Sequence, residues 1–570
     1  MKQDTKKLLV PLLIFIFFNG LKVAISAQVI TSFDLQYFFL KLLSSVAICG
    51  LFLVLFFMPK KPVYLIIFYF VQAIFISINI AYYFFFNRYL HLLSVIFLIQ
   101  ESSSLLNHFS IPLEWEMLWT LLDLPFFIYS LIKYGNIQKY LVSFTNIFKK
   151  KDIKRATALI LIFLIFFLVS ALIFTFIDSP IELARSTRFQ DEVKSVYFYG
   201  LLENSVAVFI KNPPTLNWAK LLDFGPELTF KHPEDKIKNK KIFIFQIEAL
   251  ESTAIFAKHD GEYVTPFLND LAGKSLFFPF CLSYHKGGNT SDAEFAVINS
   301  VEPLDEYPAM KLGDEAFKNS FIRFFNNAGF DSYIFHGNQA FYFDRDKAFK
   351  KAGFKEYYDI KKMGLKQYTW GAEDEDVFSF AVNKLDEQKE PFLYYIISMS
   401  SHEPYNLINI HYENERFGNI KDSRTKNFFN SINYVDKALE KSVKAIMKKY
   451  PDALIIIFGD HSTNVRKNEY YRNAICRASS GLVCEFVPLI IYGSGITPHV
   501  ENQNAVSFLD IAPTILSLAS IDATIKTYGE DLTKYEDLKN PIPFRGEKFS
   551  REELFKLIFE SLKDYLMKAQ

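Results

Sequence analysis

The sequence predicts two structural parts: an N-terminal α-helical transmembrane bundle and a C-terminal α/β domain with a mainly parallel sheet. Long apolar runs fill residues 1–178, and from residue 241 onward strand-like patterns alternate with helical ones. Half of the 570 residues are hydrophobic, which is enough for a membrane part and a packed core. The formal net charge of +1 gives no reason to expect a nucleic acid or another polyanion as partner.

The membrane bundle is predicted from about five apolar runs, each long enough to cross a bilayer, which takes about 20 residues. They occupy residues 8–29, 38–58, 63–86, 116–134 and 156–178. Basic residues precede the first run, lie between the second and third, and precede the fifth. The positive-inside rule places these basic segments in the cytoplasm. We therefore expect residues 1–178 to be a multi-pass anchor and everything beyond the fifth run to be extracytoplasmic.

Residues 179–240 are expected to link the two parts. Within them, the segment 196–210 fits an amphipathic helix on the membrane surface and fits equally well a helix packed on the outer domain. Outside the cytoplasm disulfides are permitted. Cys476 and Cys484 either close a small loop through a disulfide or remain two separate thiols, and the sequence does not distinguish these alternatives.

The α/β domain is predicted from buried strand patterns that alternate with helical segments. The patterns lie at residues 241–250, 331–338, 391–400, 453–461 and 486–494. Such alternation favours a mainly parallel sheet with helices on both faces. In these sheets functional groups gather beyond the carboxyl ends of the strands. The polar residues at those positions are Glu248, His336, Asn338, His402, Asp460 and His461.

Glu248, Asp460 and His461 combine two carboxylates with an imidazole, a ligand set that suits Mn²⁺, Zn²⁺ or Mg²⁺. Taken singly, a Glu at a strand end is more often a cap or a surface charge, and Gly-Asp-His is compatible with a plain turn. Their occurrence at corresponding ends of strands in one predicted sheet favours a divalent metal site.

Thr290 follows Gly287 and Gly288 and begins a helical pattern. Free N–H groups and the helix dipole favour negative charge at such a position, and the glycines allow a phosphate oxygen close to the backbone. A metal ion beside the hydroxyl would make it a nucleophile. On this stretch alone, the simpler interpretation is that Thr290 is an N-cap residue.

Seven stretches of the chain resemble the motifs of one family. They read QIEALES, GGNTSDAEF, FHGNQAFYFDRDKAFKKAGFKEYYD, WGAEDEDVF, SMSSHEPY, NYVDKALE and IIIFGDHS. Over about residues 240–520 they resemble the lipoteichoic acid synthase group, membrane-anchored phosphoglycerol transferases of the alkaline phosphatase/sulfatase superfamily. The resemblance implies a sulfatase-like catalytic domain over residues 241–570, on the outer side of a bacterial cytoplasmic membrane. It also favours Thr290 as the nucleophile rather than a cap.

The resemblance implies one divalent metal, usually Mn²⁺ in this group, with Zn²⁺ or Mg²⁺ as alternatives. The implied ligands are Glu248, Thr290, Asp460 and His461. Glu251 is the weaker candidate because the family pattern matches Glu248. The positions that correspond to headgroup-binding residues of the family are His336, Asn338, Phe343, Arg345 and His402.

Two of these roles follow from side-chain chemistry. Arg345 would bind phosphate oxygens through its planar fork of donors. His402 could protonate the leaving lipid oxygen and later help to deprotonate the acceptor, although without the resemblance it would pass for a structural histidine. Asn338 stands where the family has Asp, and Phe343 and Asp344 stand where it has Trp and Asn. These departures leave the phosphate chemistry intact and leave the headgroup open.

The implied activity transfers phosphoglycerol from phosphatidylglycerol to a hydroxyl of an envelope glycan or lipid through a phospho-threonine intermediate. The alternatives are phosphoethanolamine transfer from phosphatidylethanolamine and a membrane-tethered hydrolase of phosphodiesters or sulfate esters. Sulfatases place Cys or Ser in a C/S-x-P-S-R setting that NTSDAEF lacks. A non-catalytic scaffold is disfavoured because every residue of the implied metal set is present. The sequence names neither the acceptor nor the number of transfers.

Overall fold

The computed structural model describes residues 217–569 except 233–237, 306, 369, 406–414, 466 and 479–481, together with shorter N-terminal pieces. The longest of those pieces are residues 17–26, 63–86 and 115–125. The chain divides into two compact units. One contains residues 1–98 and 109–216, and the other contains residues 99–108 and 217–570.

In the N-terminal unit, the third predicted apolar run forms helix α3, Val63–Phe86. Among the described residues, no helix meets the combined requirements of length and hydropathy for crossing a membrane. The first, second and fourth runs are described only in part, and the fifth run and the segment 196–210 lie outside the described residues. The transmembrane bundle therefore stays a prediction.

A buried polar cluster joins three segments of this unit. Lys22 Nζ lies 3.0 Å from Asp123 Oδ2, and both side chains are fully buried. Asn19 donates to Gln72 Oε1 at 2.7 Å and to Asp123 Oδ2 at 2.6 Å. Removing either member of the Lys22–Asp123 pair would leave a buried charge uncompensated. Together with the hydrogen bonds of Asn19, this pair links residues 17–26, α3 and the segment around Asp123.

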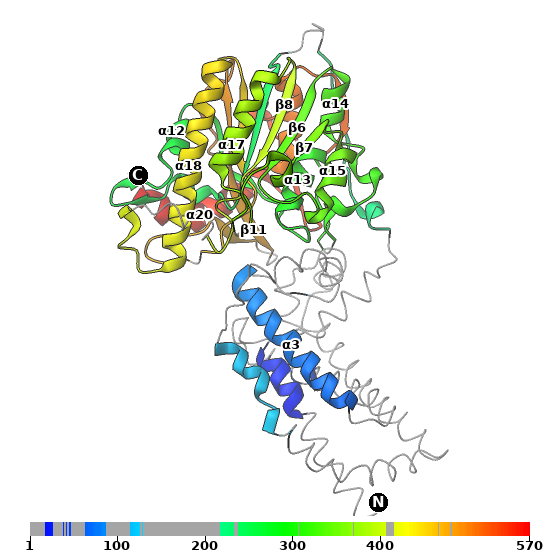
Figure 1. Cartoon of the computed structure of the whole chain (residues 1–570), viewed down its shortest axis with the longest axis vertical. Coiled ribbons are helices and arrows are strands. Elements are labelled where there is room, and N and C mark those ends of the chain that lie inside the picture. Colours follow the sequence, from blue (N-terminus) through cyan, green and yellow to red (C-terminus); the bar gives the residue numbers. More distant parts are fainter. Residues whose placement is uncertain are drawn as a thin grey trace, which may run out of the picture. The chain divides into compact units, whose positions relative to one another are not determined.

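The C-terminal unit is built around a ten-stranded sheet in which the neighbours run β12-β5-β11-β9-β2-β8-β6-β7 (Figure 1). The longer strands are β2 (Lys241–Ile247), β5 (Leu276–Leu282), β6 (Asp331–His336), β8 (Phe392–Ile397), β9 (Leu454–Gly459) and β11 (Val483–Gly493). The shorter ones are β7 (Glu356–Tyr358), β10 (Ile475–Arg477), β12 (His499–Val500) and β13 (Val506–Ser507). Strands β9, β2, β8, β6 and β7 are parallel to one another, as predicted.

Helices cover both faces of this sheet. The helices described in the unit are α12 (Pro266–Ala272), α13 (Thr290–Asn299), α14 (Phe321–Asn327), α15 (Arg345–Ala352), α16 (Ile360–Met363), α17 (Asp374–Asn383), α18 (Ser423–Lys449), α19 (Ile511–Leu518) and α20 (Arg551–Ala569). Phe245 of β2 packs edge-on against Phe378 of α17, which lies beside α18 (Figure 1). Phe458 of β9 is in register with Gln246, one residue on from Phe245. It therefore points to the opposite face, where it meets Phe508 beside α19.

Two of the longer strands differ from the prediction, and the short strands β7, β10, β12 and β13 were not predicted. The strand at residues 486–494 was expected to be parallel, but β11 runs antiparallel to both β9 and β5. Strand β5 was not predicted at all, and it contains Pro279. Its register with β11 shifts between Val487 and Leu489, opposite the stretch that holds this proline. A proline is tolerated at such a bulge because it has no N–H to donate to the ladder.

Small antiparallel pairs complete the unit: β3 (Lys258–His259) with β4 (Glu262–Tyr263), β15 (Ile542–Phe544) with β16 (Glu547–Phe549), and β1 (Glu227–Phe230) with β14 (Ala523–Lys526). Strand β1 lies within residues 179–240, the predicted linker, and it joins the C-terminal unit through this pairing. The last part of that segment is therefore folded onto the domain.

Cys476 and Cys484 stand directly opposite each other on β10 and β11, and both are free thiols. Phe486 N–H donates to Ala474 O at 2.9 Å, two residues further along the same ladder. Hydrogen-bonded pairs alternate in an antiparallel ladder, so the cysteines also form such a pair, with Cα atoms about 5.5 Å apart. That separation lies within the range of a disulfide.

Candidate functional site

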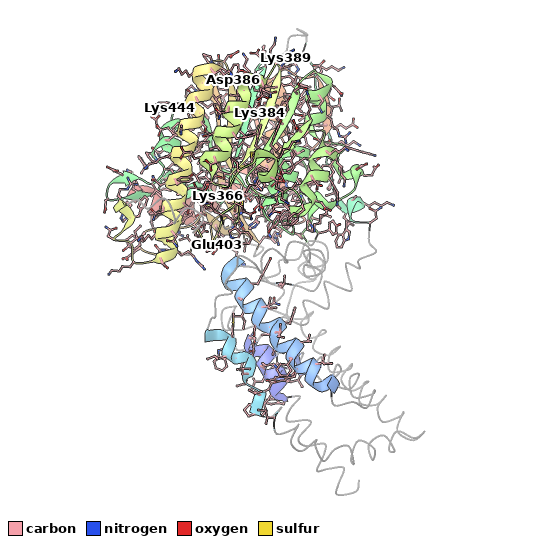
Figure 2. All side chains as sticks on the ribbon, in the orientation of Figure 1. Lys366, Lys384, Asp386, Lys389, Glu403 and Lys444 are labelled. Atoms are coloured by element: carbon pink, nitrogen blue, oxygen red, sulfur yellow. The ribbon has the colours of Figure 1, made fainter. Side chains whose placement is uncertain are left out.

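The direction of the strands brings the predicted site residues to one edge of the sheet. Ile247 of β2 is in register with Gly459 of β9, so Glu248 and Asp460, which follow them, are neighbours. Strand β5 runs the same way as β9, because both are antiparallel to β11, and it leads to the segment before Thr290. Figure 2 shows Glu403, beside His402, at one end of the domain, and Lys389, just before β8, at the other.

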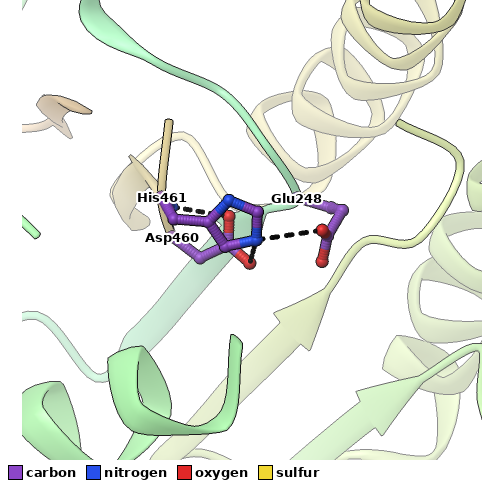
Figure 3. A group of neighbouring side chains, drawn as sticks. All are labelled: Glu248, Asp460 and His461. Atoms are coloured by element: carbon purple, nitrogen blue, oxygen red, sulfur yellow. Dashed lines mark hydrogen bonds and ion pairs between the residues drawn. The ribbon is translucent and has the colours of Figure 1, made fainter. Parts of the chain in front are cut away.

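Glu248, Asp460 and His461 form a compact ligand set (Figure 3). His461 Nε2 lies 3.1 Å from Glu248 Oε1 and 3.6 Å from Asp460 Oδ2. One ligand atom from each of the three residues can be chosen so that all lie within 4.8 Å of one another. Both carboxylates are buried. This spacing suits a single divalent cation.

Hydrogen bonds within the protein engage one ligand atom of Asp460 and one of His461 and leave the other atom of each residue available for a cation. Asp460 Oδ1 accepts the N–H groups of Ala249 at 2.8 Å and of His461 at 2.7 Å. Asp460 Oδ2 is buried and has no hydrogen-bond partner in the described part of the chain. His461 Nδ1 lies 2.9 Å from Ser462 O, to which it donates, so Nε2 is the ring nitrogen that faces the two carboxylates. A buried oxygen without a donor is the position a cation would occupy.

Electrostatics favour a positive charge between the carboxylates. Burial raises the pKa of Glu248, but the nearby His402 and His461 outweigh it and hold that pKa well below its usual range. Burial and the Glu248 carboxylate raise the pKa of Asp460. Burial lowers the pKa of His461, but Asp460 and Glu248 more than offset it and raise the value to about 10. The residues therefore fit a divalent cation.

Thr290 is the first residue of α13, and its hydroxyl donates to Glu248 Oε2 at 3.3 Å. The N-cap position belongs to Asn289, whose φ is 50°, so Thr290 is not the cap. A Cβ on Gly288 would lie 2.4 Å from Asp292 Oδ1, and Gly288 N–H donates to Asp292 Oδ2 at 2.7 Å. The glycine is therefore needed for the close approach that starts the helix.

Arg345 is buried and forms a bidentate ion pair with Glu294, which follows Thr290 by one turn of α13. Arg345 Nε lies 3.0 Å from Glu294 Oε1 and 2.9 Å from Oε2. Burial raises the pKa of Glu294, while Glu294 raises the pKa of Arg345 against the effect of burial. The two-point contact with a permanently charged guanidinium keeps the pair ionised at neutral pH. The Nε and Nη2 atoms of the guanidinium group, which was predicted to bind phosphate, thus donate to Glu294, and Nη1 is the donor left for a phosphate oxygen.

Of the remaining headgroup-binding candidates, Phe343 and His336 lie near Arg345. Phe343 has a left-handed backbone with φ 54°, and its ring centroid is 5.5 Å from Arg345 Cζ. His336 ends β6, and burial followed by the charge of Arg345 lowers its pKa to about 3. Its imidazole is therefore neutral at physiological pH. Asn338 is buried, and its Oδ1 accepts Gln339 N–H at 2.7 Å.

His402 is half-buried, and its ring lies 4.7 Å from the ring of Trp370. His402 Nδ1 donates to Glu403 O at 2.6 Å, which leaves Nε2 free to exchange a proton. The segment before His402 is held by Asp374, which accepts Met399 N–H at 2.6 Å. The position of this imidazole is therefore set by an aromatic neighbour and a well-anchored backbone.

Glu251 belongs to a separate cluster. It is buried, its Oε2 accepts Ala474 N–H at 2.9 Å, and burial raises its pKa to about 8. It does not join the ligand set of Glu248, Asp460 and His461. The preference for Glu248 over Glu251 thus agrees with the geometry.

Sequence reasoning missed three residues next to the site. Glu294 is an acidic residue among the apolar positions of α13, one turn after Thr290 and directly before the apolar residues 295–298, a signal that could have been used. His285 stacks on His461, and Glu485 lies at the start of β11 within reach of His285. No local pattern marks either residue, because their contacts depend on the antiparallel direction of β11.

Comparison with known proteins agrees with this geometry. Residues 240–521 match the family model described as Sulfatase. Lipoteichoic acid synthase 2 of Bacillus subtilis (strain 168) is 29% identical over 332 residues, which are 55% of this chain and 50% of that protein. Lipoteichoic acid synthase of Staphylococcus aureus (strain USA300) is 29% identical over 329 residues, with the same coverage. The chain spans about half the length of these curated relatives.

Two solved structures are similar to this chain. Lipooligosaccharide phosphoethanolamine transferase A from Neisseria meningitidis has a TM-score of 0.54 and 14% identity, covering 90% of this chain and 95% of that chain, so this likeness shows the fold alone. Lipoteichoic acid synthase LtaP from Listeria monocytogenes has a TM-score of 0.48 and 22% identity, covering 60% of this chain and 94% of that chain.

Proposed function

Because residues 240–521 form a sulfatase-family domain similar to lipoteichoic acid synthases, we propose that the chain is a metal-dependent phosphotransferase. It moves phosphoglycerol from phosphatidylglycerol to a hydroxyl of an envelope glycan or lipid. The observation that carries this proposal is the Thr290 hydroxyl, 3.3 Å from Glu248 and beside a buried ligand set with an unpartnered Asp460 oxygen. Such an arrangement suits a metal-activated nucleophile.

Four side chains would hold one divalent cation, Mn²⁺ or alternatively Zn²⁺ or Mg²⁺: Glu248, Thr290, Asp460 and His461. When bound, the cation supplies Lewis acidity and lowers the pKa of the hydroxyl that it touches. The two carboxylates and one imidazole are compatible with all three ions, and the ion used in the cell is part of the proposal.

In the first step the hydroxyl of Thr290 gives up its proton to solvent, from which Oγ1 takes one back when it leaves in the second step. Oγ1 forms a bond to the lipid phosphorus, and the bond from phosphorus to the diacylglycerol oxygen breaks. His402 donates the proton that this leaving oxygen needs, through the nitrogen left free by its bond to Glu403 O. Arg345 offers Nη1 to a phosphate oxygen while Glu294 holds its other edge. The product is a phosphodiester on Thr290 that carries the headgroup.

The second step reverses the roles of the groups. An acceptor hydroxyl attacks the phosphorus, His402 takes its proton, and Thr290 Oγ1 leaves and takes a proton back from solvent. With water as acceptor the same site would hydrolyse the donor. The predicted membrane anchor supports the transfer reading because tethering near the lipid raises its effective concentration. A multi-pass protein with an extracytoplasmic catalytic domain is thus part of the same proposal.

Phosphoethanolamine transfer is the second candidate. The observation in its favour is that Asn338 and Phe343, the second of which contacts Arg345, depart from the residues expected for a glycerol headgroup. The phosphate-handling residues are the same for both donors. The headgroup is therefore the point that the experiment must decide.

The test uses the full chain reconstituted in liposomes with Mn²⁺ and no acceptor. One sample contains phosphatidylglycerol and the other phosphatidylethanolamine, and peptide mass spectrometry searches for an adduct on Thr290. Thr290→Ala should carry no adduct, whereas Thr290→Ser keeps a hydroxyl and should still react. A glycerophosphate adduct supports the proposal, and a phosphoethanolamine adduct favours the second candidate. Absence of both an adduct and released diacylglycerol would refute the transferase function for these donors.

A further inference from the structure

The ring of His461 is in contact with a second imidazole that has no role in the proposed chemistry. His285 stacks on it with ring centroids 4.3 Å apart and ring planes 14° apart. His285 follows β5 and precedes Thr290 in the chain, so it comes from a different strand end than His461. The two rings are brought together by the fold and not by sequence proximity.

Glu485 ties the two sides of this stack together. Its Oε2 lies 3.2 Å from His285 Nδ1, and the same oxygen accepts Ser462 N–H at 3.2 Å. Glu485 O also accepts Ser283 N–H at 2.9 Å. One residue of β11 therefore holds both the segment that carries His285 and the residue that follows His461.

Two further hydrogen bonds hold the backbone on either side of His461. Ser283 Oγ donates to Asp460 O at 2.7 Å, and His461 Nδ1 donates to Ser462 O at 2.9 Å. With the backbone fixed on both sides, the main remaining freedom of the His461 ring is its tilt about the side-chain bonds. The face of His285 blocks that tilt on one side. The position of Nε2 relative to Glu248 thus depends on the stack.

We propose that His285 and Glu485 are positioning residues that fix the ring of His461 for a divalent cation bound with Glu248 and Asp460. The inference rests on the proposed function, because it takes that ligand set as the metal site. Residues that orient a metal-ligating histidine typically contribute 10–100-fold in metal affinity. His285 and Glu485 act through His461 and touch neither substrate nor cation.

The chain contains a matched control for the loss of a stacked histidine. His499 of β12 stacks on Tyr535, with centroids 3.9 Å apart and planes 11° apart, and its Nε2 lies 3.6 Å from Glu501 Oε2. It pairs with the amino end of β5, at the opposite end of that strand from His285. His499→Ala therefore removes the same kind of contact away from the candidate metal site.

The experiment measures Mn²⁺ binding to the purified full chain by electron paramagnetic resonance of the free ion. We expect His285→Ala to weaken binding by roughly 10–100-fold. His285→Phe keeps a ring against His461 but loses the contact with Glu485, so its loss should be smaller. His499→Ala should bind Mn²⁺ as the wild type does. Thermal unfolding monitored by circular dichroism reports whether each variant is folded.

If folded His285→Ala and folded His285→Phe both bound Mn²⁺ with wild-type affinity, the positioning role would be overturned. Equal weakening in His499→Ala would also overturn it, because the effect would then reflect general destabilisation. The outcome for the proposed function is read separately, from the adduct on Thr290. Weakened Mn²⁺ binding in His285→Ala, with neither an adduct nor released diacylglycerol in the wild type, would support the positioning role while refuting the transferase. A wild-type chain that binds none of Mn²⁺, Zn²⁺ and Mg²⁺ would overturn both.

Discussion

Replacing Glu294 with Leu tests whether the buried ion pair with Arg345 holds the nucleophile helix against the headgroup side of the site. Both side chains are almost completely buried, at 0% and 3% exposure, so solvent does not screen the charge left behind. Breaking such a pair by removing one partner typically costs about 3–5 kcal/mol. For a domain of this size, roughly 2 °C of melting temperature corresponds to 1 kcal/mol, so Glu294→Leu should melt roughly 6–10 °C lower.

The double variant Glu294→Leu/Arg345→Met separates stability from chemistry. An apolar pair of similar volume avoids the uncompensated charge, and such replacements are often neutral or stabilising. We therefore expect the double variant to melt close to the wild type but to form the Thr290 adduct poorly, because no guanidinium remains for the phosphate. The assays are thermal unfolding by circular dichroism and peptide mass spectrometry of the same samples.

Two results would refute this reasoning. If Glu294→Leu melted like the wild type, the pair would not be a buried ion pair in solution. If the double variant formed the adduct at the wild-type rate, Arg345 would have no part in binding the donor.

Three further predictions concern other parts of the domain. Gly288→Ala should abolish the Thr290 adduct and cost about 1–3 kcal/mol, measured by thermal unfolding, because its Cβ would meet the anchored Asp292 carboxylate at 2.4 Å. Glu251, with its pKa raised to about 8, holds its proton more tightly when folded. The contribution of Glu251 to stability should therefore fall by up to about 1.4 kcal/mol per pH unit from near pH 5 to pH 8. In urea titrations Glu251→Gln should lower the wild-type slope by that amount and leave the part due to other buried carboxyls such as Asp374. Excess oxidised glutathione should join Cys476 to Cys484 by thiol–disulfide exchange, so that both resist alkylation.

Each of these predictions has a control. Gly273→Ala should be tolerated, because its Cβ would meet nothing nearer than Asp270 O at 3.6 Å. An unchanged pH slope in Glu251→Gln would mean that this carboxyl is already ionised in the folded state. Cys281, buried in β5, should still be alkylated after unfolding. Alkylation of Cys476 and Cys484 as well as Cys281 would contradict the cysteine prediction.

The sequence was sufficient for features governed by strand patterns and the residues that follow them. Glu248 and Asp460 could be paired in advance because parallel strands with buried patterns end at one edge. The antiparallel direction of β11 could not be predicted, because a fully apolar strand carries no signal of its direction. Strand β5 was not predicted, and the bulge opposite β11 that accommodates Pro279 is a tertiary feature that no local pattern shows.

The residues of the candidate site likewise divide into those that the sequence predicts and those that only the tertiary structure shows. The metal-ligand candidates were recognisable only together, from their places at corresponding strand ends and from the family resemblance. Glu294, His285 and Glu485 act through other side chains, so their roles appear only when the helix after β5 and the start of β11 are placed beside β9. Strand register likewise shows that Cys476 and Cys484 face each other, which their spacing in the sequence could not show.

The shared polarity of β5, β9, β2, β8 and β6 also has a practical consequence for labelling the protein. All of the candidate chemistry lies beyond one edge of the sheet, while the exposed Lys389, just before β8, lies at the far edge (Figure 2). A fluorophore or affinity tag placed there is separated from Thr290 by the length of the strands. Single-molecule or pull-down studies can therefore attach a label near Lys389 without covering the carboxyl ends of the strands, where the candidate site lies.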